Sequence, residues 1–273
     1  MNYINIHLKG LLANQMFCVS ALFAYAWEHN LTPIVKSNQI SRNHDKGRES
    51  LLKVFPNIPF NDEVDFEIEE FLEEPKSLGF RFQIIPFYPN KNVQMRGFRQ
   101  SEKYFVHCKE LILEQFSFKK HIKEKSEFFI NSIKEESKNK QIISVHVRRG
   151  DYLNHPNAHP TCSVEWYKQA FAEFKNDNST FVIFSDDLKW CKQNFSSIDG
   201  YDIKFSSLSN NFEDLCAMTM CDHNIIANSS FSWWGAWLNR NDDKKVIAPK
   251  VWFGPSYYYH QTKDLYCENW TVL

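Results

Sequence analysis

The chain has 273 residues, which is enough for one large domain or two domains of modest size. Hydrophobic residues make up 43% and charged residues 24%, a balance that is typical of globular proteins and excludes disorder as the default. The formal net charge of −1 gives no basic field for holding a long nucleic acid, although a short basic site could still bind one small anion.

Seven cysteines are scattered along the chain, with no C-x-x-C pair and no zinc-site spacing. We therefore expect buried thiols and a reducing compartment. The opening segment MNYINIHLKG has neither the basic nor the apolar part of a secretory leader, and no apolar stretch approaches the roughly 18 residues of a membrane span. Together these features predict a cytoplasmic protein.

The first half of the chain predicts an irregular set of strands and helices. Residues 3–8 alternate and predict a strand, the apolar periodicity of residues 12–29 predicts a helix, and a second strand is expected to begin at Ile34. Residues 38–50 are polar and predict a loop, and the acidic run 62–74 predicts a variable surface region. The other elements expected here are short strands at 80–87 and 92–98 and helices at 101–116 and 119–138.

The second half alternates regularly between strands and helices. We expect strands at 141–147, 180–184, 201–205, 223–227 and 246–249, and helices at 165–174, 187–194, 212–221 and 231–239. Such alternation is typical of a parallel sheet covered by helices, which binds its ligands at the carboxyl ends of the strands. The charged segment 134–140 separates the halves, so two domains are expected, residues 1–138 and residues 139–273.

The motif His-Val-Arg-Arg-Gly-Asp-Tyr at 146–152 closes one predicted strand. His146 and Arg148 share a face of that strand because side chains alternate, and Arg149 begins the turn. Two adjacent guanidinium groups beside a glycine suit an anion clamp, since each can bind phosphate oxygens in a bidentate manner. A surface salt bridge is the alternative role for these arginines.

A second motif, N-S-S-F-S-W-W-G-A-W at 228–237, follows another predicted strand. Asn228, Ser229 and Ser230 end the strand and open a helix, where hydroxyl and N–H groups suit a phosphate. Ordinary helix capping is compatible with that role.

A third motif, Asp186-Asp187, follows the strand predicted at 180–184. Paired carboxylates could bind a divalent metal ion. Contact with a nucleoside and a structural role are the other interpretations of the pair.

Together these motifs resemble those of the inverting, GDP-fucose-dependent α-1,2-fucosyltransferases. HVRRGDY is similar to a signature shared by the α-1,2, α-1,6 and O-fucosyltransferases, and the second motif is similar to the α-1,2 branch; the matches run from residue 8 to about 253. The resemblance implies the α/β fold called GT-B, with two facing Rossmann-like domains built on parallel sheets. The donor would lie in 139–273 and the acceptor side in 1–138, with the last residues packing back on the N-terminal half.

The resemblance also implies roles for individual residues. Arg148 and Arg149 would bind the β-phosphate of GDP-fucose, His146 would contact the nucleoside, and Asp214 would accept hydrogen bonds from guanine or ribose. The other donor-side residues are Asn14, Gln15, Asp186, Asp187, Asn228, Ser229, Ser230 and Phe231. No metal or other cofactor is implied, because the family works without one and the arginines can replace a cation.

The N-terminal loop departs from the family pattern. Where the family has G-G-L-G-N-Q-M-F, residues 10–17 of this chain read GLLANQMF. Leu11 and Ala13 thus replace glycines that would let the backbone approach a ligand closely. This loop is where the donor site is expected to differ from its relatives.

The implied reaction is transfer of L-fucose from GDP-β-L-fucose to the 2-hydroxyl of an acceptor glycan, by family default a terminal galactose, with inversion. The arginines would stabilise charge on the departing GDP. Asp151 is counted with them as catalytic, and Asp151, His155 and His159 are all open candidates for the base that deprotonates the acceptor.

Other functions remain as alternatives. They are a different regiochemistry (α-1,3 or α-1,6), a non-catalytic GDP-sugar-binding protein, and binding of RNA or a phosphopeptide, against which the near-zero net charge argues. The family implies a role in O-antigen or other surface-glycan synthesis, in the cytoplasm or attached peripherally to the inner membrane. Its acceptors would be oligosaccharides or lipid-linked glycans.

Overall fold

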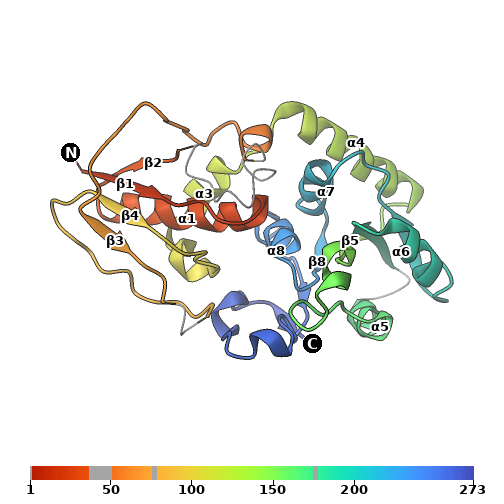
Figure 1. Ribbon diagram of the computed structural model, residues 1–273. Helices are drawn as coiled ribbons and strands as arrows, with labels where there is room; N and C mark the ends of the chain where they lie inside the picture. The colour runs from red at the N-terminus through yellow and green to blue at the C-terminus, as the bar shows by residue number, and fades with distance from the viewer. Residues whose placement is uncertain (1, 37–50, 76–78, 175–177) are drawn as a thin grey trace. The chain divides into compact units, whose positions relative to one another are not determined.

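The computed structural model describes residues 2–36, 51–75, 79–174 and 178–273. The chain divides into two compact units, one formed by Met1–Lys119 and Tyr259–Cys267 and the other by Lys120–Tyr258 and Glu268–Leu273. Each unit is built on a parallel sheet flanked by helices (Figure 1). The loop predicted at 38–50 lies outside the described residues. None of the helices in the described ranges is long and apolar enough to cross a membrane.

The first unit holds a four-stranded sheet in the order β2-β1-β4-β3. Its strands are β1 (Tyr3–Ile6), β2 (Thr32–Ile34), β3 (Glu70–Leu72) and β4 (Val93–Met95). Helix α1 (Leu12–Glu28) connects β1 to β2 and is buried along nearly its whole length. The predicted strands at 3–8 and 92–98 and the helix at 12–29 are therefore confirmed, with shorter strands than expected.

Several predictions for this unit were wrong, and one strand was missed. The strand expected to begin at Ile34 is β2, which ends at that residue. Residues 80–87 form no strand, although their sequence alternates, because their backbone N–H groups bond elsewhere: that of Phe82 donates to Asp264 Oδ2 at 2.9 Å. The acidic run contains β3, which the sequence did not predict. The helix expected at 101–116 is three short pieces, the 3₁₀ turns η3 (Glu102–Tyr104) and η4 (Val106–Cys108) and helix α3 (Lys109–Gln115).

The second unit holds a six-stranded parallel sheet in the order β10-β9-β8-β5-β6-β7. Its strands are β5 (Gln141–Val147), β6 (Ser179–Ser185), β7 (Asp202–Phe205), β8 (His223–Ile225), β9 (Val246–Ala248) and β10 (Thr271–Val272). Its α-helices are α4 (Lys120–Glu136), α5 (Val164–Ala172), α6 (Leu188–Phe195), α7 (Asn211–Met218) and α8 (Ser230–Trp237). All elements predicted from residue 119 onward are confirmed, and β10 is additional.

Alternation along β5 and β6 supplies a core on each face of this sheet. Val145 and Val147 pack with residues of α5 and α6 on one face. Ile142 and Phe184 pack with residues of α4 and α7 on the other. These side chains are fully buried or nearly so, and each contributes about 1.5–3 kcal/mol relative to an exposed position.

The strand order fixes where a ligand would bind in this unit. The chain moves outward from β5 to β6 and β7, then returns to β8 on the other side of β5 and continues to β9 and β10. The order therefore reverses between β5 and β8. In open parallel sheets the crevice outside the carboxyl ends at such a reversal is the usual binding site.

Candidate active site

Arg148 lies directly after β5, at the carboxyl edge of the sheet. Its guanidinium is held by two carboxylates, with Nη1 2.7 Å from Asp186 Oδ2 and Nη2 2.5 Å from Asp151 Oδ1. The guanidinium carbon also lies 5.3 Å from the centre of the Tyr152 ring. Asp186 comes from the end of β6, so pairing of β5 with β6 brings this group together.

Arg149 is held by one ring and one carboxylate and leaves donors available. Its guanidinium carbon is 3.7 Å from the centre of the Trp190 ring, and its Nε is 3.2 Å from Asp187 Oδ2. Its backbone N–H donates to Asp186 Oδ1 at 2.9 Å. Neither terminal nitrogen of Arg149 has a hydrogen-bond partner among the residues that the structure describes. The stacked, planar cation is thus oriented with two donors unused.

Asp186 and Asp187 are therefore both engaged by the arginines. Asp187 also caps α6, since its carboxylate accepts from Trp190 N at 3.1 Å. A divalent cation at this pair would compete with two guanidinium groups for the same oxygens. Within the described part of the chain, no three His, Cys, Asp or Glu side chains are grouped so as to hold a metal ion.

His146 points to the other face of the sheet from Val145 and Val147 and is 4% exposed. Its ring centre is 5.4 Å from that of Phe231, and its Nδ1 is buried without a hydrogen-bond partner in the described chain. Burial, reinforced by the charge of Arg148, lowers the pKa of His146 to about 3. The ring is therefore neutral, with one polar atom unsatisfied.

Helix α8 begins across the strand reversal from the arginines, after β8. Ser229 is its N-cap and accepts from Phe231 N at 3.3 Å, and Ser230 opens the helix. Asn228 is 1% exposed and turns its amide inward, donating to the carbonyls of Pro160 at 2.8 Å and Trp252 at 3.0 Å. Asn228 thus fixes neighbouring loops, while the two serines form the start of α8.

Asp214 lies in the first turn of α7, on the β7 side of the arginines. Its Oδ1 accepts from the Ser206 hydroxyl at 2.6 Å, and Ser206 directly follows β7. Burial raises the pKa of Asp214 to about 6, against the opposing effect of the Ser206 hydrogen bond. The carboxylate is thus a partly desolvated hydrogen-bond acceptor.

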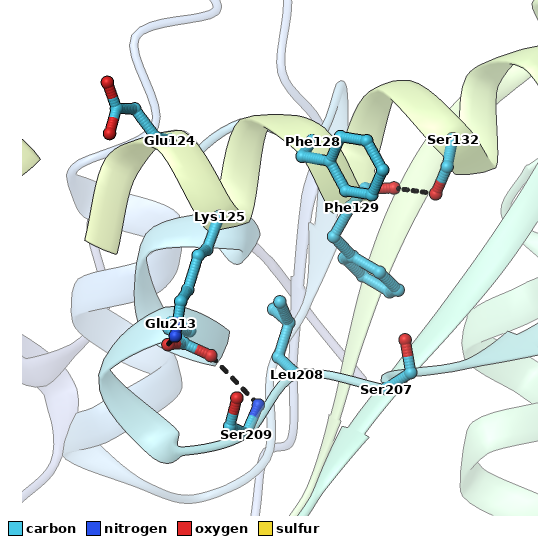
Figure 2. Close-up of a pocket in the computed structure, with 9 residues that line it drawn as sticks. All are labelled: Glu124, Lys125, Phe128, Phe129, Ser132, Ser207, Leu208, Ser209 and Glu213. Atoms are coloured by element: carbon cyan, nitrogen blue, oxygen red, sulfur yellow. Dashed lines mark hydrogen bonds and ion pairs between the residues drawn. The ribbon is translucent and has the colours of Figure 1, made fainter. Parts of the chain in front are cut away.

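A pocket of about 430 Å³ lies between α4 and the loop from β7 to α7 (Figure 2). Phe128, Phe129 and Leu208 give it an apolar wall. Lys125 Nζ lies 3.0 Å from Glu213 Oε1, and Glu213 also accepts from Ser209 N at 2.9 Å. None of the predicted site residues lines this pocket.

Asn14 and Gln15 belong to the first unit, in the first turn of α1. Asn14 Oδ1 accepts from Gln100 Nε2 at 2.7 Å, and Gln15 Nε2 donates to Gly10 O at 2.9 Å. Gly10 has a φ of +71°, and an added Cβ there would lie 2.3 Å from Asn14 Nδ2. The glycine retained from the family pattern is therefore the one that this turn requires, and Leu11 and Ala13 stand beside it at the helix start.

Sequence reasoning missed several members of the second unit's site. Trp190 stacks on Arg149, Tyr152 lies against Arg148, and Ser206 binds Asp214. Tyr152 belongs to the motif at 146–152, but nothing in the sequence assigns its ring a role. A signal for Trp190 was its position in the first turn of a helix that follows the strand next to the arginines.

Comparison with known proteins identifies the family. The chain matches Glycosyl transferase family 11 over residues 2–273. The chain belongs to this family. An α-1,2-colitosyltransferase of Escherichia coli is 38% identical over 176 residues, 59% of this chain and 57% of the relative. The O-antigen biosynthesis glycosyltransferase WbnK of E. coli is 38% identical over 121 residues, and these cover 42% of this chain and 40% of WbnK.

A more distant relative aligns over more of this chain. The galactoside α-(1,2)-fucosyltransferase 2 of Oryctolagus cuniculus is 25% identical over 252 residues, 87% of this chain and 67% of that enzyme. The chain thus spans about half the length of the E. coli members of the family that it matches.

Solved structures agree on the fold. The NodZ α-1,6-fucosyltransferase soaked with GDP-fucose has a TM-score of 0.56 at 13% identity, covering 87% of this chain and 93% of NodZ. A glycosyl transferase family 9 protein of Veillonella parvula has a TM-score of 0.55 at 13% identity, covering all of this chain and 86% of that one. With the two parallel sheets, these likenesses confirm the predicted α/β fold of the GT-B class.

Proposed function

We propose that this family 11 glycosyltransferase moves L-fucose from GDP-β-L-fucose to a glycan hydroxyl, with inversion and formation of an α-1,2 linkage. The observation that carries the proposal is the arginine pair at the reversal of the strand order. There Asp186, Asp187 and Trp190 hold both guanidinium groups in place at the carboxyl end of β5. Such a fixed pair is suited to a diphosphate.

The two arginines would bind the diphosphate in different ways. Arg149 presents its two terminal nitrogens and would bind the β-phosphate directly. Arg148 carries two carboxylate partners, of which Asp151 is 62% exposed and free to move away when a phosphate replaces it. Negative charge that builds on the departing GDP would meet these cations and the start of α8 at Ser229 and Ser230.

The nucleoside would lie on the α7 side of the arginines. His146 offers a neutral ring with an unsatisfied Nδ1, and Phe231 lies against that ring. Asp214, which the Ser206 hydroxyl holds by a hydrogen bond, would accept hydrogen bonds from N1–H and N2–H of guanine. Asn228 would act by holding the surrounding loops, and Asp186 and Asp187 by orienting the arginines.

The second unit would thus be the donor domain, and the first unit would contribute the acceptor side together with Asn14 and Gln15. The name of WbnK supports a surface glycan as the acceptor. All seven cysteines are free thiols, which supports a reducing, cytoplasmic setting, with at most peripheral attachment to a membrane.

The charges at the site support catalysis without a metal ion, because the carboxylates that could bind one are paired with arginines. We expect the rate of transfer to be unchanged by EDTA and by added Mg²⁺ or Mn²⁺. A rate that falls with EDTA and returns with one of these cations would contradict this expectation.

The proposal is tested by incubating the purified chain with GDP-fucose and a panel of β-galactosides that includes lactose. We expect a fucosylated product, with the α-1,2 linkage established by NMR. If GDP-fucose binds but is never consumed, the chain is a non-catalytic GDP-sugar-binding protein. If the product is α-1,3 or α-1,6 linked, the proposed regiochemistry is wrong.

GDP-colitose is a second candidate donor substrate, because the chain is similar to an α-1,2-colitosyltransferase. Colitose is the 3-deoxy analogue of L-fucose, so one added hydroxyl distinguishes the two sugars. The same assay run with GDP-colitose measures the preference. A kcat/KM larger for GDP-colitose than for GDP-fucose would reassign the donor.

A further inference from the structure

His159 lies in the loop that connects the turn η5 (Gly150–Asn154) to α5, and three aromatic rings surround it. Its ring stacks on Tyr152, with centres 4.8 Å apart and planes 23° apart. The ring centres of Phe253 and Tyr257 lie at 5.7 and 5.6 Å. The imidazole is therefore held in one orientation rather than carried on a free surface loop.

The loop itself is tied to the carboxyl end of β8. Asn228 donates to the carbonyl of Pro160, the residue after His159, and the Tyr152 hydroxyl donates to Asn228 O at 2.9 Å. Arg148 lies over the same Tyr152 ring that His159 stacks on. The Tyr152 ring thus contacts both His159 and Arg148 of the proposed phosphate clamp, and all three residues lie in the same unit at the same edge of the sheet.

The ring is set up as a neutral base. Burial lowers the pKa of His159 below its ordinary value; the carboxylate of Asp151 opposes this effect, and His155 and Arg148 add to it. Of the two ring nitrogens, Nδ1 is buried without a partner among the described residues. Because no acceptor fixes a proton on Nδ1, both tautomers are open, and Nε2 is the acceptor in the one that is protonated at Nδ1.

The other two candidate bases are less well placed. Asp151 is 62% exposed and is held by Arg148 at 2.5 Å, so no group fixes its position once a phosphate takes its place. His155 is exposed and contributes its backbone carbonyl, which accepts from His159 N at 2.8 Å. Among the described residues, His155 has no aromatic ring against it that could stabilise its imidazolium form.

We propose that His159 accepts the proton of the acceptor hydroxyl during transfer, an inference that rests on the proposed function. The hydroxyl oxygen forms a bond to C1 of the sugar as its proton passes to the imidazole. The bond from C1 to the phosphate oxygen breaks, and its electron pair leaves with GDP. Asp151 and the stacked ring of Tyr152, with Phe253 and Tyr257 beside it, stabilise the imidazolium until its proton passes to water.

The test compares His159→Gln with His155→Gln, which removes the other histidine of the same loop. We expect H159Q to lower kcat about 100- to 10,000-fold, the range for loss of a general base, with the Kd of GDP unchanged within about twofold. H155Q should keep wild-type kcat. In the wild type kcat/KM should fall on the acid side as His159 is protonated, and H159Q should lack that limb.

Chemical rescue separates proton transfer from a packing role. In His159→Ala, added imidazole should restore part of kcat, whereas it should leave His155→Ala unaffected. Wild-type kcat in H159Q, an unchanged acid limb in that variant, or the absence of rescue in a variant that still binds GDP would overturn the inference. Failure of the wild type to consume GDP-sugars would instead overturn the proposed function, so the two failures are distinguishable.

Discussion

At the scale of single residues, the two arginines of the motif have different surroundings. Arg149 stacks on Trp190 and keeps two donors unused, whereas both terminal nitrogens of Arg148 are paired. Lysine cannot reproduce the stacked, planar fork. We therefore expect Arg149→Lys to lower kcat about 100- to 1000-fold, the usual loss when one donor to a developing charge is removed.

Steady-state kinetics with saturating GDP-fucose measure this loss. The control is Lys189→Gln, which removes an exposed positive charge from α6, the helix that carries Trp190, and should leave kcat within about twofold of wild type. Wild-type kcat in R149K would mean that the positive charge at position 149, and not the planar fork of Arg149, supports the reaction.

Asp214 gives a prediction that links function to stability. Its pKa is raised from 3.8 to about 6, so the folded chain holds this proton more tightly than the unfolded chain. The carboxylate therefore costs stability above about pH 6, and that cost disappears as the pH falls toward 3.8. We expect Asp214→Asn to raise the free energy of unfolding by about 1–3 kcal/mol in neutral solution.

The same substitution should weaken the donor site, because an amide turned toward guanine would place N–H against N–H. We expect the Kd of GDP to rise about tenfold or more, the effect of losing a charge-assisted hydrogen bond. Urea unfolding in neutral and acidic buffer and calorimetric titration with GDP measure the two effects. A variant that is less stable in neutral solution, or that binds GDP normally, would contradict the assignment.

The sequence predicted those site residues that lie inside short motifs. HVRRGDY located the arginines because a predicted strand ended there, and the resemblance supplied their roles. Their partners were not predictable in this way. Asp186 is 37 residues from Arg149 and reaches its backbone N–H only because β5 and β6 pair in register. Asn228 was predicted beside the phosphate, but which way its amide turns depends on loops at 160 and 252.

At the scale of elements, regular alternation was predictable and irregular segments were not. The strands of the second unit are apolar runs bounded by polar turns, which local sequence reveals. Segment 80–87 has a similar alternation, but Pro86 lacks an N–H group and the N–H groups of Phe82 and Gln83 bond to side chains. Strand β3 has three residues in an acidic run, and only its pairing with β4 defines it.

The turn after β5 offers a test of how an element positions the clamp. A Cβ added at Gly150 would lie 2.5 Å from Asp186 Oδ2, the atom that holds Arg148. The carboxylate is the far end of a flexible side chain, so it can move aside and break the ion pair. We expect Gly150→Ala to lower kcat about tenfold or more, as for loss of one charged hydrogen bond, with little change in Tm.

Gly200→Ala is the matched control, because its effect should be the reverse. Gly200 has open space around it but a φ of +84°, which an alanine adopts only with strain. It precedes β7 at the amino edge of the sheet, away from the arginines. We expect a lower Tm and an unchanged kcat. A G150A enzyme that loses Tm and kcat together would show that the turn, and not the ion pair, was disturbed.

At the scale of the whole molecule, the strand order of the second unit gathers residues that are far apart in the sequence. The carboxyl ends of β5, β6, β7 and β8 follow one another along one edge of the sheet, and each is followed by a predicted donor residue or its partner. A GDP molecule bound along this edge would therefore touch the separate stretches of chain that follow β5, β7 and β8, with the residues after β6 holding the arginines. Local sequence identifies each stretch, and only the sheet order makes them one site.

Hydrogen–deuterium exchange on the full chain can test that arrangement. With saturating GDP we expect slower amide exchange in 148–153, 206–216 and 228–232, because a ligand there orders the turn after β5, the start of α7 and the start of α8. Strands β3 and β4 of the first unit should exchange as in the free protein. Slower exchange at 10–17 as well would support the donor contacts implied for Asn14 and Gln15.

Which stretches are protected from exchange, rather than how strongly, tests where GDP binds. Arg149→Lys should reduce protection in all three stretches together, because the diphosphate joins them. Asp214→Asn should reduce it first in 206–216, because that carboxylate is proposed to hold only the base. Protection confined to the first unit, or to the pocket residues of α4, would mean that GDP binds elsewhere and that the arginine pair has another role.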